Sequence, residues 1–158
     1  MLKSLIGATA LVLASVAIAL AADTPTSPSA PSAPAVDIDL ATARARIDAS
    51  DWKGATDVLQ KALARDPGNA DYHNLLAYSI RKGPNPNMDL VFKHYGEALR
   101  INPKHRDAHE YIGEAYLMVG NVGKAKEHLA ALDKLCFLPC GQFRDLKRAI
   151  ERYEASKK

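Results

Sequence analysis

Residues 62–67 read Ala-Leu-Ala-Arg-Asp-Pro, and residues 98–103 read Ala-Leu-Arg-Ile-Asn-Pro. An alanine is thus followed five residues later by a proline at two places that lie 36 residues apart. A period of roughly 20 to 50 residues indicates an array of structural repeats. In each copy the proline ends one helix and leads to the next, because its ring cannot continue a helix.

Apolar residues at helical spacing surround both segments. Small side chains let two antiparallel helices approach closely, and large apolar side chains fill the space between them. The pattern predicts three helix pairs, at 37–49 with 52–64, 70–82 with 88–100, and 105–119 with 122–135. A last helix at 142–156 places Phe143, Leu146, Ile150 and Tyr153 on one side, as expected of a helix that caps a stack.

The fuller pattern resembles the tetratricopeptide repeat (TPR). It consists of Ala55, Leu59, Ala62 and Pro67, then Leu76, Ala77, Val91, Tyr95, Ala98 and Pro103, then Ile112, Gly113, Tyr116, Gly120, Ala125, Leu129 and Leu132. The resemblance implies an all-α, right-handed α-solenoid of about three TPR helix pairs plus a C-terminal capping helix. The repeats would span about 36–69, 70–105 and 106–135, within a helical domain at 36–156. Residues 83–87, Gly-Pro-Asn-Pro-Asn, lengthen the second repeat and are expected to protrude.

The N-terminal residues predict export. Residues 5–20 carry no charge and end in small residues, which is typical of a signal peptide over 1–22. This apolar run is shorter than the roughly 20 residues of a membrane-spanning helix, so no stable membrane insertion is expected after cleavage. Residues 23–35 are rich in Pro, Ala and Ser and indicate an extended linker. We expect a protein secreted across the inner membrane, with the periplasm as its destination.

The charge balance excludes one class of partner. The chain has 21 basic and 18 acidic residues, a net charge of +3, and no basic face of the kind that binds nucleic acid. The serines of the helical part stand in no nucleophile motif, and residues 120–125 lack the spacing of a phosphate-binding loop. We therefore expect no enzyme, no cofactor and no metal site.

The resemblance implies a binding groove lined by the first helix of each pair, where similar proteins hold peptides or partner helices. Tyr78 and Tyr111 could equally pack between neighbouring repeats. The Lys, Asn and Arg set with which some TPR proteins clamp a terminal carboxylate is missing, and the third repeat is acidic. This favours another protein or peptide with basic or mixed side chains as the partner. The residues expected in the groove are Asn74, Tyr78, Arg81, Asp107, Glu110, Tyr111 and Glu114.

The two cysteines, Cys136 and Cys140, lie where the third pair meets the cap. In an exported protein such neighbours usually form a disulfide, and Pro139 provides a turn between them. Two alternatives to an adaptor remain open from the sequence. One is a periplasmic protein that uses this pair for thiol-redox or copper/zinc handling. The other is a self-assembling TPR subunit of an envelope complex, which would form a homo-oligomer. His73 and His109 occupy equivalent repeat positions and are interpreted as packing residues.

Overall fold

The computed structural model describes residues 36–157, which form seven α-helices and no strand. Each helix lies within one residue of its expected range, and the all-α fold is confirmed. The signal peptide and the linker predicted for residues 1–35 lie outside the described residues. The helices are α1 (Ile38–Asp48), α2 (Trp52–Arg65), α3 (Ala70–Lys82), α4 (Met88–Ile101), α5 (Arg106–Met118), α6 (Val122–Leu135) and α7 (Gly141–Ala155).

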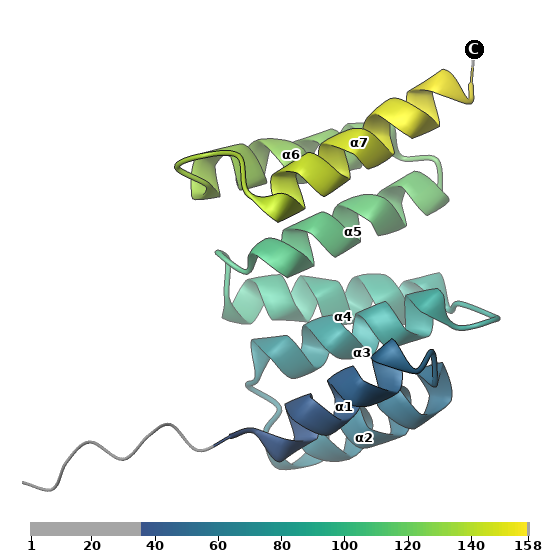
Figure 1. Ribbon diagram of the computed structural model, residues 1–158, viewed down its shortest axis with the longest axis vertical. Helices are drawn as coiled ribbons and strands as arrows, with labels where there is room; N and C mark the ends of the chain where they lie inside the picture. Colours follow the sequence, from purple (N-terminus) through teal and green to yellow (C-terminus); the bar gives the residue numbers. More distant parts are fainter. Residues whose placement is uncertain (1–35, 158) are drawn as a thin grey trace, which may run out of the picture. The chain divides into compact units, whose positions relative to one another are not determined.

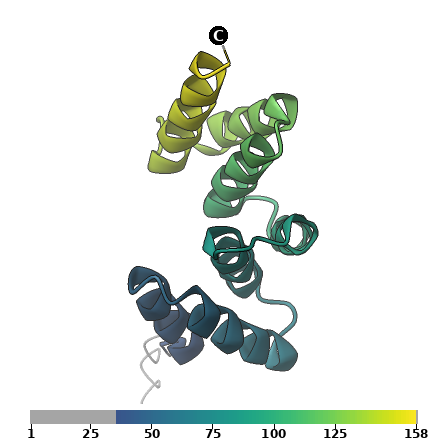
Figure 2. The same ribbon diagram turned by 90° about the vertical axis from the view of Figure 1, so that its right-hand side faces the viewer.

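The helices form three antiparallel pairs that stack in chain order, with α7 last (Figures 1 and 2). Within the pairs, α1 contacts α2, α3 contacts α4, and α5 contacts α6. The first helices also contact one another, since α3 touches both α1 and α5, and α5 touches α7. The row α1, α3, α5 and α7 therefore lines one continuous face of the stack.

Three buried apolar clusters hold successive pairs together. Each cluster joins a helix pair to the first helix that follows it, and α7 takes that part for the third pair. The stack therefore needs a closing helix, because the third cluster would otherwise face water. The cluster cores are Ala43, Leu59, Ala62, Tyr72 and Leu76, then Ala77, Val91, Tyr95, Ile112 and Ala115, then Leu117, Ala125, Leu132, Leu146 and Ile150.

Six of the seven described helices have a polar side chain at the N-cap position. Each accepts a hydrogen bond from a backbone N–H of the first turn, which has no partner inside the helix. The exception is α7, where Cys140 stands at the cap position and makes no such bond. The capping residues are Asp37, Asp51, Asn69, Asn87, His105 and Asn121.

The turns inside the first and third pairs have the same geometry. Ser50 and Gly120 both have a positive φ, 56° and 79°, and each is followed by the residue that caps the next helix. Glycine adopts this left-handed conformation without strain, whereas serine does not. The second pair departs from this turn, and residues 83–87 extend as a loop between α3 and α4 (Figure 1), as the two prolines predicted.

Within residues 36–157, no helix combines the length and the apolar character that crossing a bilayer requires.

Gly113 marks the closest helix approach among the described glycines. A Cβ atom at this position would lie 2.6 Å from a methyl carbon of Leu146, which is fully buried on α7. Gly96 is also inside a helix, but a Cβ there would meet nothing within 4 Å. Substitutions at these two glycines therefore test helix propensity and helix packing separately.

We predict opposite effects of alanine at these positions. Gly96→Ala should raise the free energy of unfolding by about 0.5–1 kcal/mol, because alanine is the better helix former. Gly113→Ala gains the same propensity but overpacks the α5–α7 contact, which costs about 1–3 kcal/mol. Urea unfolding of both variants measures the difference. Equal stabilisation by both would mean that α7 does not pack against Gly113.

Candidate functional site

The row of first helices is hollowed where α1, α3 and α5 meet. The hollow has a volume of about 270 Å³. It is lined by aliphatic, aromatic and charged side chains, and three of the charged ones are carboxylates. The lining residues are Arg44, Ile47, Asp48, Asp71, Asn74, Leu75, Tyr78, Asp107 and Tyr111.

Four of the residues expected in the groove meet in this hollow: Asn74, Tyr78, Asp107 and Tyr111. Sequence reasoning had not included Asp48 and Asp71. Asp71 could have been found from the repeat period, because it stands 36 residues before Asp107. Asp48 ends α1, and no residue of this helix was among those expected in the groove.

Arg81 is directed into the protein. Its side chain is 7% exposed, and it forms an ion pair of 2.9 Å with Glu114 across α3 and α5. Its Nε also donates to the hydroxyl of Tyr95 over 3.3 Å. Breaking one partner of a buried ion pair leaves an uncompensated charge, so this contact ties the second repeat to the third. The sequence pattern gave no sign of this pairing.

Tyr78 and Tyr111 pack against each other and line the hollow at the same time. Their ring centroids are 4.8 Å apart, and the guanidinium carbon of Arg81 lies 5.4 Å and 5.8 Å from the two centroids. Trp52 extends the cluster, with its ring centroid 6.3 Å from that of Tyr78. The two interpretations left open for these tyrosines therefore both describe the structure.

Asn74 is the most deeply buried polar residue of the hollow. It is 2% exposed, and no described residue offers its Oδ1 a hydrogen bond. A buried polar atom without a partner costs about 1–3 kcal/mol. Which atom of the amide is oxygen and which is nitrogen follows from the hydrogen-bond network, so the finding is an amide with one buried end unused.

Glu110 lies on the same helix, between Asp107 and Glu114. Burial, together with the charges of Glu114, Asp145 and Asp107, raises the pKa of the Glu110 carboxyl to about 8, against the opposite effect of Arg81. Glu110 therefore holds a proton at neutral pH. It does not line the hollow, so the structure does not bring it together with Asn74 and Tyr78.

A second hollow of about 280 Å³ continues the first along the row of first helices. The two share Asp71 and Asp107 in their walls. Gln142 of α7 donates to Asp107 over 2.7 Å, which connects the cap to the shared wall. Nε2 of His105 lies 3.2 Å from Asp71 but outside hydrogen-bonding geometry. The concave surface thus extends over the three first helices and α7.

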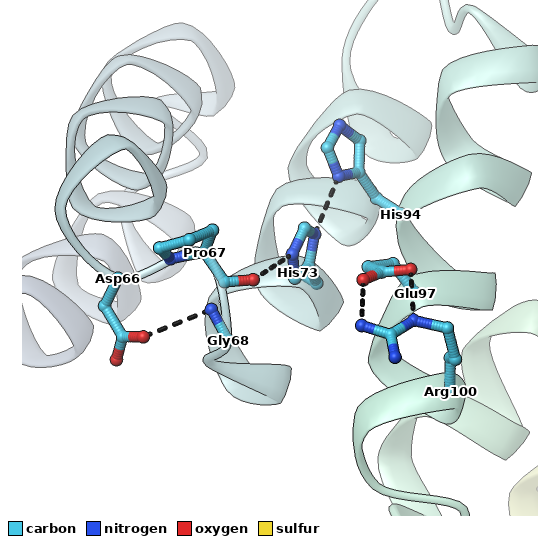
Figure 3. A network of polar contacts seen from close by, with 7 residues as sticks. All are labelled: Asp66, Pro67, Gly68, His73, His94, Glu97 and Arg100. Atoms are coloured by element: carbon cyan, nitrogen blue, oxygen red, sulfur yellow. Dashed lines mark hydrogen bonds and ion pairs between the residues drawn. The ribbon is translucent and has the colours of Figure 1, made fainter.

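Two histidine pairs repeat with the period of the fold. Nδ1 of His73 lies 2.9 Å from Nδ1 of His94, and its Nε2 lies 3.1 Å from the carbonyl oxygen of Pro67 (Figure 3). His109 makes the same contacts with His128, at 3.0 Å, and with the carbonyl oxygen of Pro103, at 3.0 Å. These contacts give His73 and His109 the packing role that their equivalent positions suggested.

The tautomers of these pairs follow from their contacts. A carbonyl oxygen only accepts, so Nε2 of His73 donates to Pro67, and in the neutral ring Nδ1 is then the acceptor. Nδ1 of His94 must therefore carry the proton of the pair. Figure 3 also shows Arg100 paired with Glu97 one helical turn beyond His94. Burial, with the charge of His73 next, lowers the pKa of His94.

Cys136 and Cys140 lie at disulfide distance, with Sγ atoms 2.13 Å and Cα atoms 5.8 Å apart. Between them, Phe137 and Leu138 are fully and largely exposed. Within residues 36–157 no three His, Cys, Asp or Glu side chains gather as metal ligands would. The pair closes the connection between α6 and α7.

Comparisons with known proteins support the fold. No protein-family model matches the chain, and no curated protein matches it. The chain is similar to the solved structure of the Yersinia enterocolitica type III secretion translocator chaperone SycD, with a TM-score of 0.66 and 15% identity, over 76% of this chain and 83% of that one. A second structure of SycD, in an alternative dimer, has a TM-score of 0.64 and 16% identity, over 77% and 92% of the two chains.

The histidine pairs predict a destabilising contribution in mild acid. Burial, with the charge of His109 next, lowers the pKa of His128 to about 4. Below about pH 6.5 the unfolded chain therefore holds a proton at this histidine that the folded chain lacks, so the contribution of His128 to stability falls as the pH drops from about 7 towards 4. Discounted for partial exposure, this amounts to about 1–2 kcal/mol. The raised pKa of Glu110 acts in the opposite sense, so the contribution has to be measured at the histidine itself.

The measurement is the urea midpoint of the wild type and of His128→Gln at pH 7 and pH 5. Glutamine keeps a hydrogen-bonding partner for His109 but does not titrate in this range, so the variant should lose less stability between the two pH values. A parallel loss in both proteins would show that other groups cause the acid sensitivity.

The cysteine pair predicts a local contribution to stability. Replacing both cysteines with alanine should lower the free energy of unfolding by about 2 kcal/mol on the loop-entropy model, a modest amount because the ring is small. Changing Cys140 to serine instead of alanine, with Cys136→Ala, should recover about 1 kcal/mol, because serine caps a helix and α7 has no side-chain cap. Thermal unfolding of the two variants distinguishes the contribution of the disulfide from that of the helix cap. Identical melting temperatures would exclude the capping contribution.

Proposed function

We propose that this chain is a non-enzymatic adaptor or chaperone, which holds a segment of a partner polypeptide on the face formed by α1, α3, α5 and α7. The single observation that carries the proposal is the hollow of about 270 Å³ between α1, α3 and α5. It brings two tyrosines, three carboxylates and a buried amide onto one concave surface. Tyrosine side chains of this kind are frequent anchors in protein interfaces.

The fold supports a binding role over a catalytic one. SycD, whose structures share this fold, is a chaperone. Fold alone does not imply function, so the argument rests on the concave surface and uses the likeness as support. The charge of the surface agrees with the expectation of a basic or mixed partner, because Asp48, Asp71 and Asp107 face Arg44 there.

We also propose that the protein works in the periplasm. The support is the pattern of residues 1–22, an uncharged run followed by small residues. The cysteine pair at disulfide distance agrees with an oxidising compartment. In this proposal the disulfide is structural and holds the connection to α7, while the repeats bind the partner.

The proposal predicts that the partner contacts one face. A photo-crosslinking amino acid is placed at Arg44 or Asp71, which line the hollow, in the chain expressed from its full sequence in its host cell. Irradiation should join these positions to a polypeptide that mass spectrometry identifies. The matched controls are Asp57 and Lys61, which are exposed on α2 and do not line this hollow.

The distribution of cross-links distinguishes groove binding from the two alternative functions. Adducts at Arg44 and Asp71 but not at Asp57 and Lys61 support the groove. Equal adducts from both faces would refute it. Adducts that contain only a second copy of this chain would instead favour the self-assembling subunit. A mixed disulfide through Cys136 or Cys140 would favour the thiol-redox protein.

A further inference from the structure

We propose that the hollow between α1, α3 and α5 is a pocket for a positively charged side chain, an arginine or lysine of the bound polypeptide. This inference rests on the proposed function and adds the chemical class of the group that is recognised. It follows from the charge of the hollow, from its aromatic wall and from its unused amide.

The charge of the hollow is negative. Three carboxyl groups, those of Asp48, Asp71 and Asp107, line it together with one guanidinium, that of Arg44. The carboxyl groups come from three different helices, so the negative charge surrounds the hollow. Two of them already have neighbours, since Gln142 donates to Asp107 and His105 approaches Asp71. Neither neighbour lines this hollow, so the surplus of carboxyl groups within it remains.

The aromatic wall adds a second attraction for cations. Tyr78 and Tyr111 line the hollow, and both rings already attract a guanidinium, that of Arg81, at 5.4 Å and 5.8 Å. Arg81 itself does not line the hollow. A cation over a tyrosine face is attracted by the ring, and more strongly when it is desolvated. The wall of the pocket is therefore of a kind that this protein already uses to hold an arginine.

The unused amide supplies an observation that is independent of charge. Asn74 lines the hollow and is only 2% exposed. Its Oδ1 has no hydrogen-bond partner among the described residues. Folding a polar atom into such a place is costly unless something binds there. Arginine and lysine carry only donors, so they pair with this amide through its carboxamide oxygen, the end that lacks a partner as the side chain is placed here.

The size of the hollow fits one side chain. Pockets for drug-sized ligands measure roughly 300–1,000 Å³, and this hollow has about 270 Å³. The aliphatic residues Ile47 and Leu75 complete its lining. They suit the methylene stem of an arginine or lysine, which prefers apolar contact while its head binds polar groups.

The first test uses a single charged side chain as probe. N-acetyl-arginine amide is titrated into isotope-labelled protein, expressed from its full sequence and purified in the form that the cell delivers, and amide resonances are followed by NMR. N-acetyl-citrulline amide has nearly the same shape without the charge. We expect saturable shifts around Asn74, Tyr78 and Tyr111 with a Kd on the order of 1–10 mM for arginine. Citrulline should bind at least about fivefold more weakly.

Two variants with a matched control complete the test. Asp48→Asn removes one charge from the hollow at the end of α1, and Asp57→Asn removes one from the exposed face of α2. The first should weaken arginine binding about threefold or more, and the second should leave it unchanged. Asn74→Leu, which keeps the volume, should weaken binding while the protein stays as stable or becomes more stable.

Three outcomes would overturn the inference. They are equal affinity for arginine and citrulline, equal loss in Asp48→Asn and Asp57→Asn, and undiminished arginine binding by Asn74→Leu. If cross-links from Arg44 and Asp71 to a polypeptide stand in any of these cases, the proposed function survives and only the cationic pocket falls. Arginine binding without such cross-links would overturn the polypeptide-binding function on which the inference rests.

Discussion

The close approach of helix backbones is the constraint on which the rest of the structure depends. Alanine is frequent among the fully buried residues of the stack, and Gly113 against Leu146 is the tightest glycine contact between two described helices. Only at that distance do the three apolar clusters close, each between a pair and the first helix that follows. The spacing also sets how far apart the first helices stand, and so it shapes the concave face that α1, α3 and α5 share.

The helices could be predicted because their signals are local. Prolines, capping side chains and apolar periodicity act within a few residues, so each helix was placed within one residue. The site was harder to predict, because it depends on which side chains of different helices pair with each other. Tyr78 and Tyr111 were expected by register, but the Arg81–Glu114 ion pair crosses from α3 to α5 and leaves no pattern along the chain. The same holds for the unused amide of Asn74, which is defined by what surrounds it.

Repetition explains how packing and recognition coexist in so small a stack. The histidine pairs recur at equivalent places in the second and third repeats, where they fasten α3 and α5 to the turn before each of them and to the second helix of the pair. With those contacts fixed, positions elsewhere on the first helices are free to differ between repeats. Asp71 and Asp107 are equivalent positions that remain alike, whereas Asn74 and Glu110 stand at equivalent positions and differ in kind. The packing contacts therefore repeat between the second and third repeats, whereas some of the side chains on the concave face differ.

The weak anchoring of α1 has a mechanical consequence. This helix buries only Ala43, and its polar contacts to the rest of the fold include the Asp37–Tyr72 hydrogen bond of 2.9 Å and the exposed ion pairs Asp39–Arg65 and Arg46–Asp51. A load applied through the chain before residue 36 enters the fold at this helix. Because each repeat contacts only its neighbours, such a pull would peel α1 away before it disturbs α5 or α7. Tension would thus remove one wall of the hollow and open it while most of the stack stays folded.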